Sequence, residues 1–181
     1  MDNNITVHII DKEHSADINI PNEPFSLFGR LLPSYIDGEW NYQALHFADA
    51  EVRQMCFPDE NYNFDELSKN SVILGAYNEK ECIGIAILQH SWNKYMYLYD
   101  LKVNQRYRGK HIGSHLIEEA KKVSMKHGYH GLYTKGQDNN LGACLFYLKS
   151  GFTIGGIDTH VYKGTRQEGK SDIIFYTNSQ I

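Results

Sequence analysis

The sequence predicts one α/β (α+β) domain that spans residues 1–181, on three grounds. A length of 181 residues suits a single domain of ordinary size. Hydrophobic residues make up 41% of the chain and charged residues 22%, a globular composition that excludes disordered and collagen-like proteins. Along the chain, three β-rich runs precede segments that alternate between helical and strand periodicity. This order indicates a β-meander followed by helices and further strands.

The N-terminal residues, 1–24, are expected to form a partly separate arm with a strand at Ile5–Ile10. The segment after this strand admits only short helical pieces, because it is interrupted by Pro21, Pro24 and Pro33. A helix is expected over residues 41–53, since apolar or half-apolar side chains recur at helical spacing at Tyr42, Leu45, His46 and Phe47.

The three β-rich runs are Val72–Tyr77, Cys82–His90 and Tyr95–Val103. A polar turn at Asn78–Glu81 separates the first two, which predicts an antiparallel meander. The third run has the period of two that is typical of a strand. One set of its side chains is Tyr97, Tyr99, Leu101 and Val103, and the alternate set is Leu98, Asp100 and Lys102.

From Lys110 to His127 the period becomes helical, with one face formed by Ile112, Leu116, Ala120, Val123 and His127. Gly128 is expected to end this helix. A strand, a second helix closed by Gly151 and two more strands complete the domain. We expect them at Gly131–Lys135, Asn140–Ser150, Phe152–Ile157 and Asp172–Thr177.

Composition excludes several functional classes. No run approaches the ~18 apolar residues of a membrane span, and Met1–Asn4 lack a basic n-region, so we expect a cytosolic protein without a membrane partner. The net charge of -4 and the pI near 6.1 disfavour a nucleic-acid partner. No C-x-x-C pair or disulfide framework is formed by Cys56, Cys82 and Cys144.

Charge is distributed unevenly along the chain. Residues 49–66 contain six acidic residues against one basic residue, whereas residues 102–126 contain seven basic residues against two acidic ones. Each region is either a solvated surface or a ligand site. In the second interpretation the basic region holds an anionic ligand and the acidic region attracts a cationic one.

The segment from Val103 to Ser114 favours an anion site. A strand ends there, a basic turn containing Gly109 follows, and a helix containing Gly113 begins at once. Free N–H groups at a helix start suit a phosphate, and glycines permit close approach of its oxygens. The segment matches neither the Walker loop nor the dinucleotide-binding G-x-G-x-x-G pattern.

Arg108–Gly113 resembles motif A of the GNAT superfamily of acetyl-CoA-dependent N-acetyltransferases, [QR]-x-x-G-x-[GA], with His111 in place of the middle glycine. A non-glycine residue is acceptable there with a negative φ, which we expect from the first helical turn. Asn140–Phe152 resembles motif B, N-x-x-A-x-x-F-Y-x-x-x-G-F. The resemblance implies a mixed, mostly antiparallel sheet with a V-shaped splay between the strands that end near Val103 and Lys135.

The same resemblance implies acetyl-CoA as cosubstrate and a set of residues that bind it. These residues are Leu101, Lys102, Val103, Arg108, Gly109, Lys110, His111, Ile112, Gly113, Ser114, Asn140, Ala143 and Tyr147.

Further segments resemble streptothricin acetyltransferases, a branch of this superfamily. These segments are Asn22–Phe25, Trp92–Tyr95, Gln137–Asn140 and Ile157–Thr159. The resemblance implies streptothricin, a polycationic antibiotic, as the acceptor, acetylated on a β-lysine amine, by a monomer or a homodimer. Where this branch has a glutamate before the strand aspartate, this chain has Tyr99 before Asp100.

The family resemblance implies direct transfer, in which the amine attacks the thioester while both ligands are bound. Tyr147 is then the acid that protonates the leaving thiolate. Asp100 is either the base for the acceptor amine or a carboxylate that only binds the ammonium or pairs with Lys102. Another polyamine or a protein amine as acceptor, and a non-catalytic CoA-binding module, are the competing functions.

Two other patterns have a structural interpretation beside the functional one. His111 and His115 have the i, i+4 spacing of a zinc pair but lack the glutamate of H-E-x-x-H and a third ligand, so we expect no metal. An aromatic group either lines the acceptor pocket or packs as an ordinary strand surface. Its members are Trp92, Tyr95, Tyr97 and Tyr99.

Overall fold

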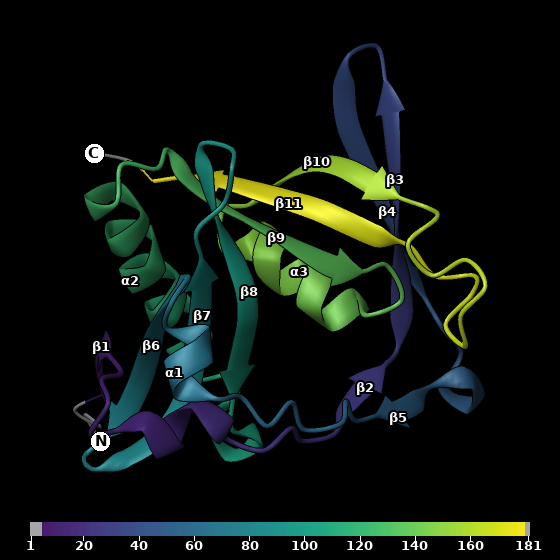
Figure 1. Ribbon diagram of the computed structural model, residues 1–181. Coiled ribbons are helices and arrows are strands. Elements are labelled where there is room, and N and C mark those ends of the chain that lie inside the picture. Colours follow the sequence, from purple (N-terminus) through teal and green to yellow (C-terminus); the bar gives the residue numbers. More distant parts are fainter. Residues whose placement is uncertain (1–4, 180–181) are drawn as a thin grey trace. The chain divides into compact units, whose positions relative to one another are not determined.

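The computed structural model describes residues 5–179, and Figure 1 shows its ribbon. The chain divides into two compact units. The first unit comprises Met1–Glu23, Cys56–Leu132 and Asn178–Ile181, and the second comprises Pro24–Met55 and Tyr133–Thr177. Met1–Asn4, on which the expectation of no leader peptide rests, lie outside the described residues. Within residues 5–179, no helix has both the length and the apolar character that crossing a bilayer requires.

The first unit is built on four antiparallel strands in the order β1-β6-β7-β8. The strands are β1 (Ile5–Ile9), β6 (Ser71–Asn78), β7 (Glu81–Gln89) and β8 (Tyr95–Val103). Its helical elements are η1 (Ser15–Asn19), α1 (Phe64–Leu67), η3 (Gln105–Tyr107) and α2 (Ile112–Lys126). The predicted meander is confirmed, and β1 pairs with β6 along its whole length.

Helix α2 packs against β6, β7 and β8 through the face that the sequence predicts. Ile112, Leu116, Ala120 and Val123 are all buried, whereas His127, which was predicted on the same face, is the exposed C-cap of α2. A Cβ built on Gly84 of β7 would lie 3.3 Å from a Leu116 methyl, so the face of β7 that carries Gly84 meets α2. The opposite face forms a second apolar cluster with Ile10, Ile18, Ile73, Ile85 and Ile87.

The second unit contains three strands in the order β9-β11-β10 and two small antiparallel pairs, β2-β5 and β3-β4. The strands are β2 (Phe25–Leu27), β3 (Gly29–Ile36), β4 (Glu39–His46), β5 (Arg53–Met55), β9 (Gly131–Gln137), β10 (Thr153–Asp158) and β11 (Asp172–Asn178). The first two residues of β9 and the last residue of β11 belong to the first unit. The helical elements are η2 (Asp49–Glu51) and α3 (Leu141–Lys149), and α3 packs on β2 and β3.

The predicted helix over residues 41–53 is wrong, because β4, η2 and β5 occupy this range. Strands β3 and β4 form a hairpin whose turn is Asp37-Gly38, with φ of 52° and 86°. An Asp-Gly pair with two positive φ angles is the two-residue turn that suits the twist of a hairpin. Pro33 lies inside β3, where a strand with only one neighbour tolerates its missing N–H.

The predicted C-terminal half is confirmed to within a few residues. Gly128 and Gly151 follow α2 and α3 with φ of 77° and 84°, as expected of glycines that end helices. The fold class is also confirmed, a mixed α/β fold with a mostly antiparallel sheet. The V-shaped splay and the single domain with a partly separate N-terminal arm stay predictions.

Candidate functional site

The turn between β8 and α2, in the first unit, presents backbone amides ahead of a helix. The first hydrogen bond that closes α2 runs from the His115 N–H to the His111 oxygen over 3.0 Å. The N–H groups of Ile112, Gly113 and Ser114 therefore precede the first intrahelical bond and lie at the positive end of the dipole. Nothing lies within 4 Å of a Cβ built on Gly109, so a ligand has room there. These features fit a diphosphate.

His111 differs from the expectation. Its φ is +63° and its ψ is 8°, a left-handed conformation, so the predicted negative φ is wrong. The residue is the N-cap of α2 rather than the first residue of its opening turn. Gly109 has a φ of +73°, so left-handed residues flank Lys110 in the turn. Alternation of left-handed and right-handed residues is the backbone pattern from which anion-binding nests are built.

We expect His111→Gly to stabilise the protein. A left-handed non-glycine residue destabilises the folded state by about 1–2 kcal/mol, and glycine removes this strain. Glycine also increases the entropy of the unfolded state, which offsets about 0.4–1 kcal/mol of the gain. The free energy of unfolding should therefore rise by about 0.5–1 kcal/mol, measured by urea denaturation. His115→Gly, inside α2, is the matched control and should lower stability by about 0.3–0.5 kcal/mol. Equal losses in both variants would contradict the strain at His111.

The basic side chains of the turn are partly engaged already. Arg106 pairs with Glu81. Arg108 donates its Nε–H to the Val103 oxygen over 3.0 Å, and Lys110 lies with its Nζ 5.3 Å from the centroid of the Tyr107 ring. These contacts hold the turn in place, so its positive charge is anchored where β8 ends.

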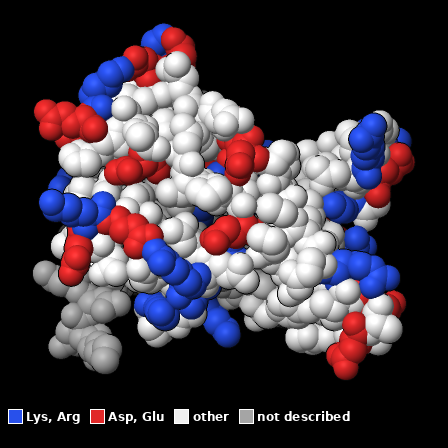
Figure 2. Space-filling model, turned by 90° about the horizontal axis from the view of Figure 1, so that it is seen from below, with Lys and Arg blue, Asp and Glu red and all other residues white. Residues whose placement is uncertain are grey.

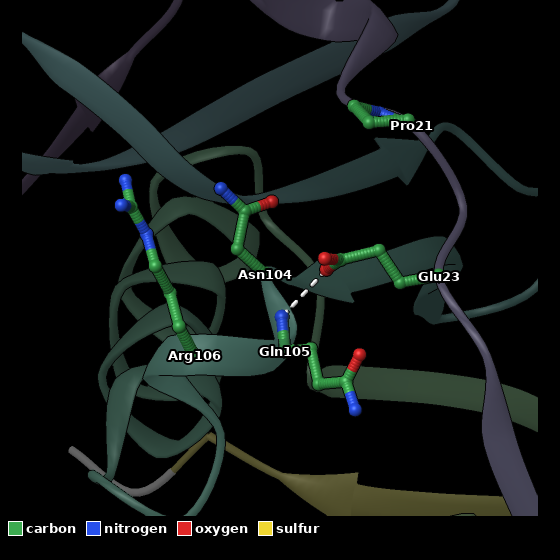
Figure 3. A pocket seen from close by; sticks show the side chains of 5 residues that line it. All are labelled: Pro21, Glu23, Asn104, Gln105 and Arg106. Atoms are coloured by element: carbon green, nitrogen blue, oxygen red, sulfur yellow. Dashed lines mark hydrogen bonds between the residues drawn. The ribbon is translucent and has the colours of Figure 1, made fainter.

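An open pocket of about 460 Å³ borders the same turn, lined by Pro21, Glu23, Asn104, Gln105 and Arg106. Figure 3 shows the Glu23 carboxylate reaching toward the backbone nitrogen of Gln105. That N–H donates to Glu23 Oε2 over 2.5 Å, so the amide at the start of η3 has an acceptor within the protein. The amides argued to be open to a ligand are those of Ile112, Gly113 and Ser114, which precede the first intrahelical bond of α2.

Asp100 lies on β8 in a mostly buried polar cluster of the first unit. The Tyr62 hydroxyl donates to Asp100 Oδ2 over 3.1 Å, and the Lys102 Nζ lies 3.5 Å from the same oxygen. Lys102 also pairs with Glu60, and its side chain is 10% exposed. Burial raises the pKa of Asp100 above its usual value, although the Lys102 cation opposes that shift. The predicted pairing of Asp100 with Lys102 is thus present in the structure.

A β-bulge at Tyr99 sets the direction of this cluster. Ile87 faces Asp100 and Leu88 faces Leu98, which leaves Tyr99 without an opposing residue on β7. The predicted alternation therefore fails at this point, and Leu98 lies on the opposite face from Asp100 and Lys102. Bulges of this kind commonly redirect side chains next to functional sites.

The acidic run of residues 49–66 is divided between the two units. Asp49 and Glu51 belong to the second unit. In the first unit, Asp65 pairs with Lys12 and Glu66 with Lys69 on the surface. Figure 2 likewise shows acidic side chains close to basic ones. For these residues the solvated-surface interpretation fits, whereas Glu60 is drawn into the cluster with Lys102.

The second unit holds the residues of the predicted motif B. Asn140 is the N-cap of α3, and its Oδ1 accepts the Ala143 N–H over 3.2 Å. Tyr147 lies one further turn along and is half-buried. Its ring lies 5.5–5.6 Å, between centroids, from Phe146, Phe152 and Phe175. The helix is therefore capped and Tyr147 is held by aromatic packing.

The predicted site residues are divided between the two units. The first unit holds Asp100, Leu101, Lys102, Val103 and the turn residues 108–114, and the second holds Asn140, Ala143 and Tyr147. Sequence reasoning missed Tyr62 and the specific contacts of Asn22, Glu23 and Glu60. Asn22 binds Pro58, Asp59 and Glu60 through its backbone and side chain. The resemblance at Asn22–Phe25 marked this segment, but it does not predict which residues Asn22 and Glu23 contact.

Two further patterns from the sequence concern a metal site and the aromatic group around β8. Among residues 5–179, no three His, Cys, Asp or Glu side chains form a group that could hold a metal ion. Trp92 is 95% exposed, whereas Tyr97 and Tyr99 contact each other and Tyr99 also contacts Tyr62. Of the predicted aromatic group, Tyr99 therefore lies beside the Asp100 cluster, through its contact with Tyr62.

Comparisons with known proteins agree on one family. The model of the Acetyltransferase (GNAT) family matches residues 38–152. Streptothricin acetyltransferase A of Bacillus subtilis (strain 168) is 33% identical over 160 residues, which are 88% of this chain and 92% of that protein.

Solved structures give the same result. A solved structure from Bacillus anthracis str. Ames is described as a streptothricin acetyltransferase in complex with acetyl coenzyme A. It is 27% identical to this chain with a TM-score of 0.83, and the match covers 96% of this chain and 98% of the Bacillus anthracis chain. Nourseothricin acetyltransferase, 20% identical with a TM-score of 0.78, covers 97% of this chain and 99% of that one and supports the fold alone.

Proposed function

Because the chain belongs to the acetyltransferase (GNAT) family and uses acetyl-CoA as its acetyl donor, we propose that it acetylates a β-lysine amine of streptothricin antibiotics and thereby inactivates them. The observation that carries this proposal is the 33% identity with the Bacillus subtilis relative over 92% of that protein. The polar cluster around Asp100 supports it, because a partly buried carboxylate suits an ammonium ligand. We place the reaction in the cytoplasm.

In this proposal the β8–α2 turn binds the diphosphate of acetyl-CoA. The amides of Ile112, Gly113 and Ser114 donate to phosphate oxygens, and Arg108 and Lys110 contribute positive charge. Backbone N–H groups of Leu101–Val103 stabilise the negative charge that develops on the thioester oxygen. Asn140, Ala143 and Tyr147 of α3 are the further residues proposed to contact acetyl-CoA.

The chemistry proposed is direct transfer with both ligands bound. An ammonium near pKa ~10 has to lose a proton before its nitrogen can attack. Asp100 takes that proton, the nitrogen bonds to the thioester carbon, the carbon–sulfur bond breaks, and the thiolate receives a proton from Tyr147. The acylated nitrogen then releases its second proton, which restores the Tyr147 hydroxyl and leaves a neutral amide. Asp100 as an ammonium-binding residue only is the alternative role.

A covalent cysteine route receives no support from Cys82 or Cys144. Cys144 is fully buried, and burial raises the pKa of its thiol to about 12. Burial likewise raises the pKa of Cys82 to about 11. Both thiols are therefore held in the protonated form, which is a weak nucleophile.

Thiol release from acetyl-CoA tests the proposed acceptor. Purified protein is given streptothricin, spermidine, an aminoglycoside or a lysine peptide in parallel. We expect streptothricin to give the highest kcat/KM and mass spectrometry to show one acetyl group on its β-lysine moiety. Strong turnover of another amine, with no stimulation by streptothricin, would refute the assignment.

A further inference from the structure

Lys102 lies between two carboxylates in the first unit. Its Nζ is paired with Glu60 and lies 3.5 Å from Asp100 Oδ2, so the Glu60 contact is the closer one. Asn22 fixes Glu60 from the other side, because its Nδ2 lies 3.1 Å from each Glu60 carboxylate oxygen. Glu60, Lys102 and Asp100 therefore form a charged network in which Lys102 lies closer to Glu60 than to Asp100.

The groups that face Asp100 are few. From its own strand comes Lys102, and from the segment before α1 come Tyr62, through a hydrogen bond, and Glu60, through its charge. On the neighbouring strand β7, the residues opposite Asp100 and Lys102 are Ile87 and Ile85, which are apolar and fully buried. Glu60 and Lys102 therefore act on Asp100 with charges of opposite sign.

We propose that Glu60 is a positioning residue that holds Lys102 away from Asp100 and so keeps the Asp100 carboxylate available to accept a proton from the acceptor ammonium. The proposal rests on the assignment of Asp100 as base in the proposed function. It also explains how the chain functions without the glutamate expected where Tyr99 stands, since a carboxylate from a distant segment joins the cluster.

Competition for one cation is the physical basis. Without Glu60, Lys102 has a single anionic partner and would close on Asp100, where a tight ion pair makes a carboxylate a weak base. With Glu60 present, the cluster has two negative charges and one positive charge, which leaves one negative charge for an ammonium to compensate. Burial is the main cause of the raised pKa of Asp100; Lys102 lowers that pKa and Glu60 raises it.

Opposite substitutions test the proposal. Glu60→Gln should lower the pKa of Asp100, and Lys102→Met should raise it, both followed by ¹³C NMR of aspartate carboxyls in the free protein. Because a base is active when deprotonated, the acid limb of the kcat profile should move to lower pH in Glu60→Gln and to higher pH in Lys102→Met. We expect kcat of Glu60→Gln at neutral pH to fall by ~3- to 10-fold, with Glu60→Asp recovering part of the loss.

Glu66→Gln is the matched control, because Glu66 belongs to the same acidic run and pairs with Lys69 on the surface. It should leave both the Asp100 pKa and the pH profile unchanged. An Asp100 pKa that is unchanged or raised in Glu60→Gln overturns the proposal. If that pKa falls while the acid limb stays in place, Glu60 does control Asp100, and the assignment of Asp100 as base fails instead.

Discussion

Tyr147→Phe should lower kcat by ~10²–10⁴-fold, because it removes the hydroxyl proposed to protonate the departing thiolate. Affinity for acetyl-CoA should change little. The aromatic contacts of the ring with Phe146, Phe152 and Phe175 do not need the hydroxyl, so the variant should also fold. Steady-state thiol release with the best amine acceptor gives kcat, and calorimetric titration gives the dissociation constant of acetyl-CoA.

Tyr35→Phe is the matched control, since it deletes the same hydroxyl from a side chain that is 61% exposed on β3. It should leave kcat at the wild-type value. A Tyr147→Phe variant with unchanged kcat would remove Tyr147 from the proton transfer. A variant with unchanged kcat/KM and lower kcat would show that the hydroxyl acts after the first irreversible step.

The parts of the fold that could be predicted are those whose signals are local. The amphipathic period of α2 and glycines that end α2 and α3 are read directly from neighbouring residues, and both helices lie where these signals place them. The three strands of the meander were equally clear, since each has a long β-rich run. Local periodicity is reliable when one face of an element is buried.

The β3–β4 hairpin shows where that reasoning fails. Its strands are a two-stranded pair with several exposed apolar side chains, among them Tyr35, Ile36 and Tyr42. After Leu31 no residue of β3 is buried, and none of β4 is, so the sequence there does not have to alternate. The spacing of Tyr42 and Leu45 resembled that of a helix. The informative signal was the Asp37-Gly38 turn, which predicts a hairpin whatever the pattern of the strands.

The polar cluster could be predicted only in part. Asp100 and Lys102 are separated by one residue on a strand, so their proximity follows from the sequence. The contacts of Asn22 with Glu60, of Tyr62 with Asp100 and of Glu60 with Lys102 join residues 38 to 42 positions apart, and no local pattern encodes such contacts. The bulge at Tyr99 also requires the register with β7, which sequence alone does not supply.

Ser114→Glu should weaken acetyl-CoA binding by ~10²-fold without destabilising the protein. Ser114 is the third residue of α2, where a carboxylate interacts favourably with the helix dipole and is worth about 0.3–1 kcal/mol. The same carboxylate would face the proposed diphosphate, and like charges at about 4 Å repel by ~1 kcal/mol in water and ~4 kcal/mol near a protein surface. An intermediate cost of ~2.7 kcal/mol corresponds to the hundredfold loss.

Ser114→Gln separates charge from size, because it adds a side chain of similar length without the carboxylate, and it should bind acetyl-CoA more tightly than the glutamate variant. Higher ionic strength should narrow the gap between the two variants, since salt screens exposed charges beyond about 10 Å at 0.1 M. At saturating acetyl-CoA the kcat of Ser114→Glu should approach the wild-type value, which distinguishes a binding defect from the loss expected for Tyr147→Phe. If Ser114→Glu binds acetyl-CoA with unchanged affinity, the diphosphate does not bind at the start of α2.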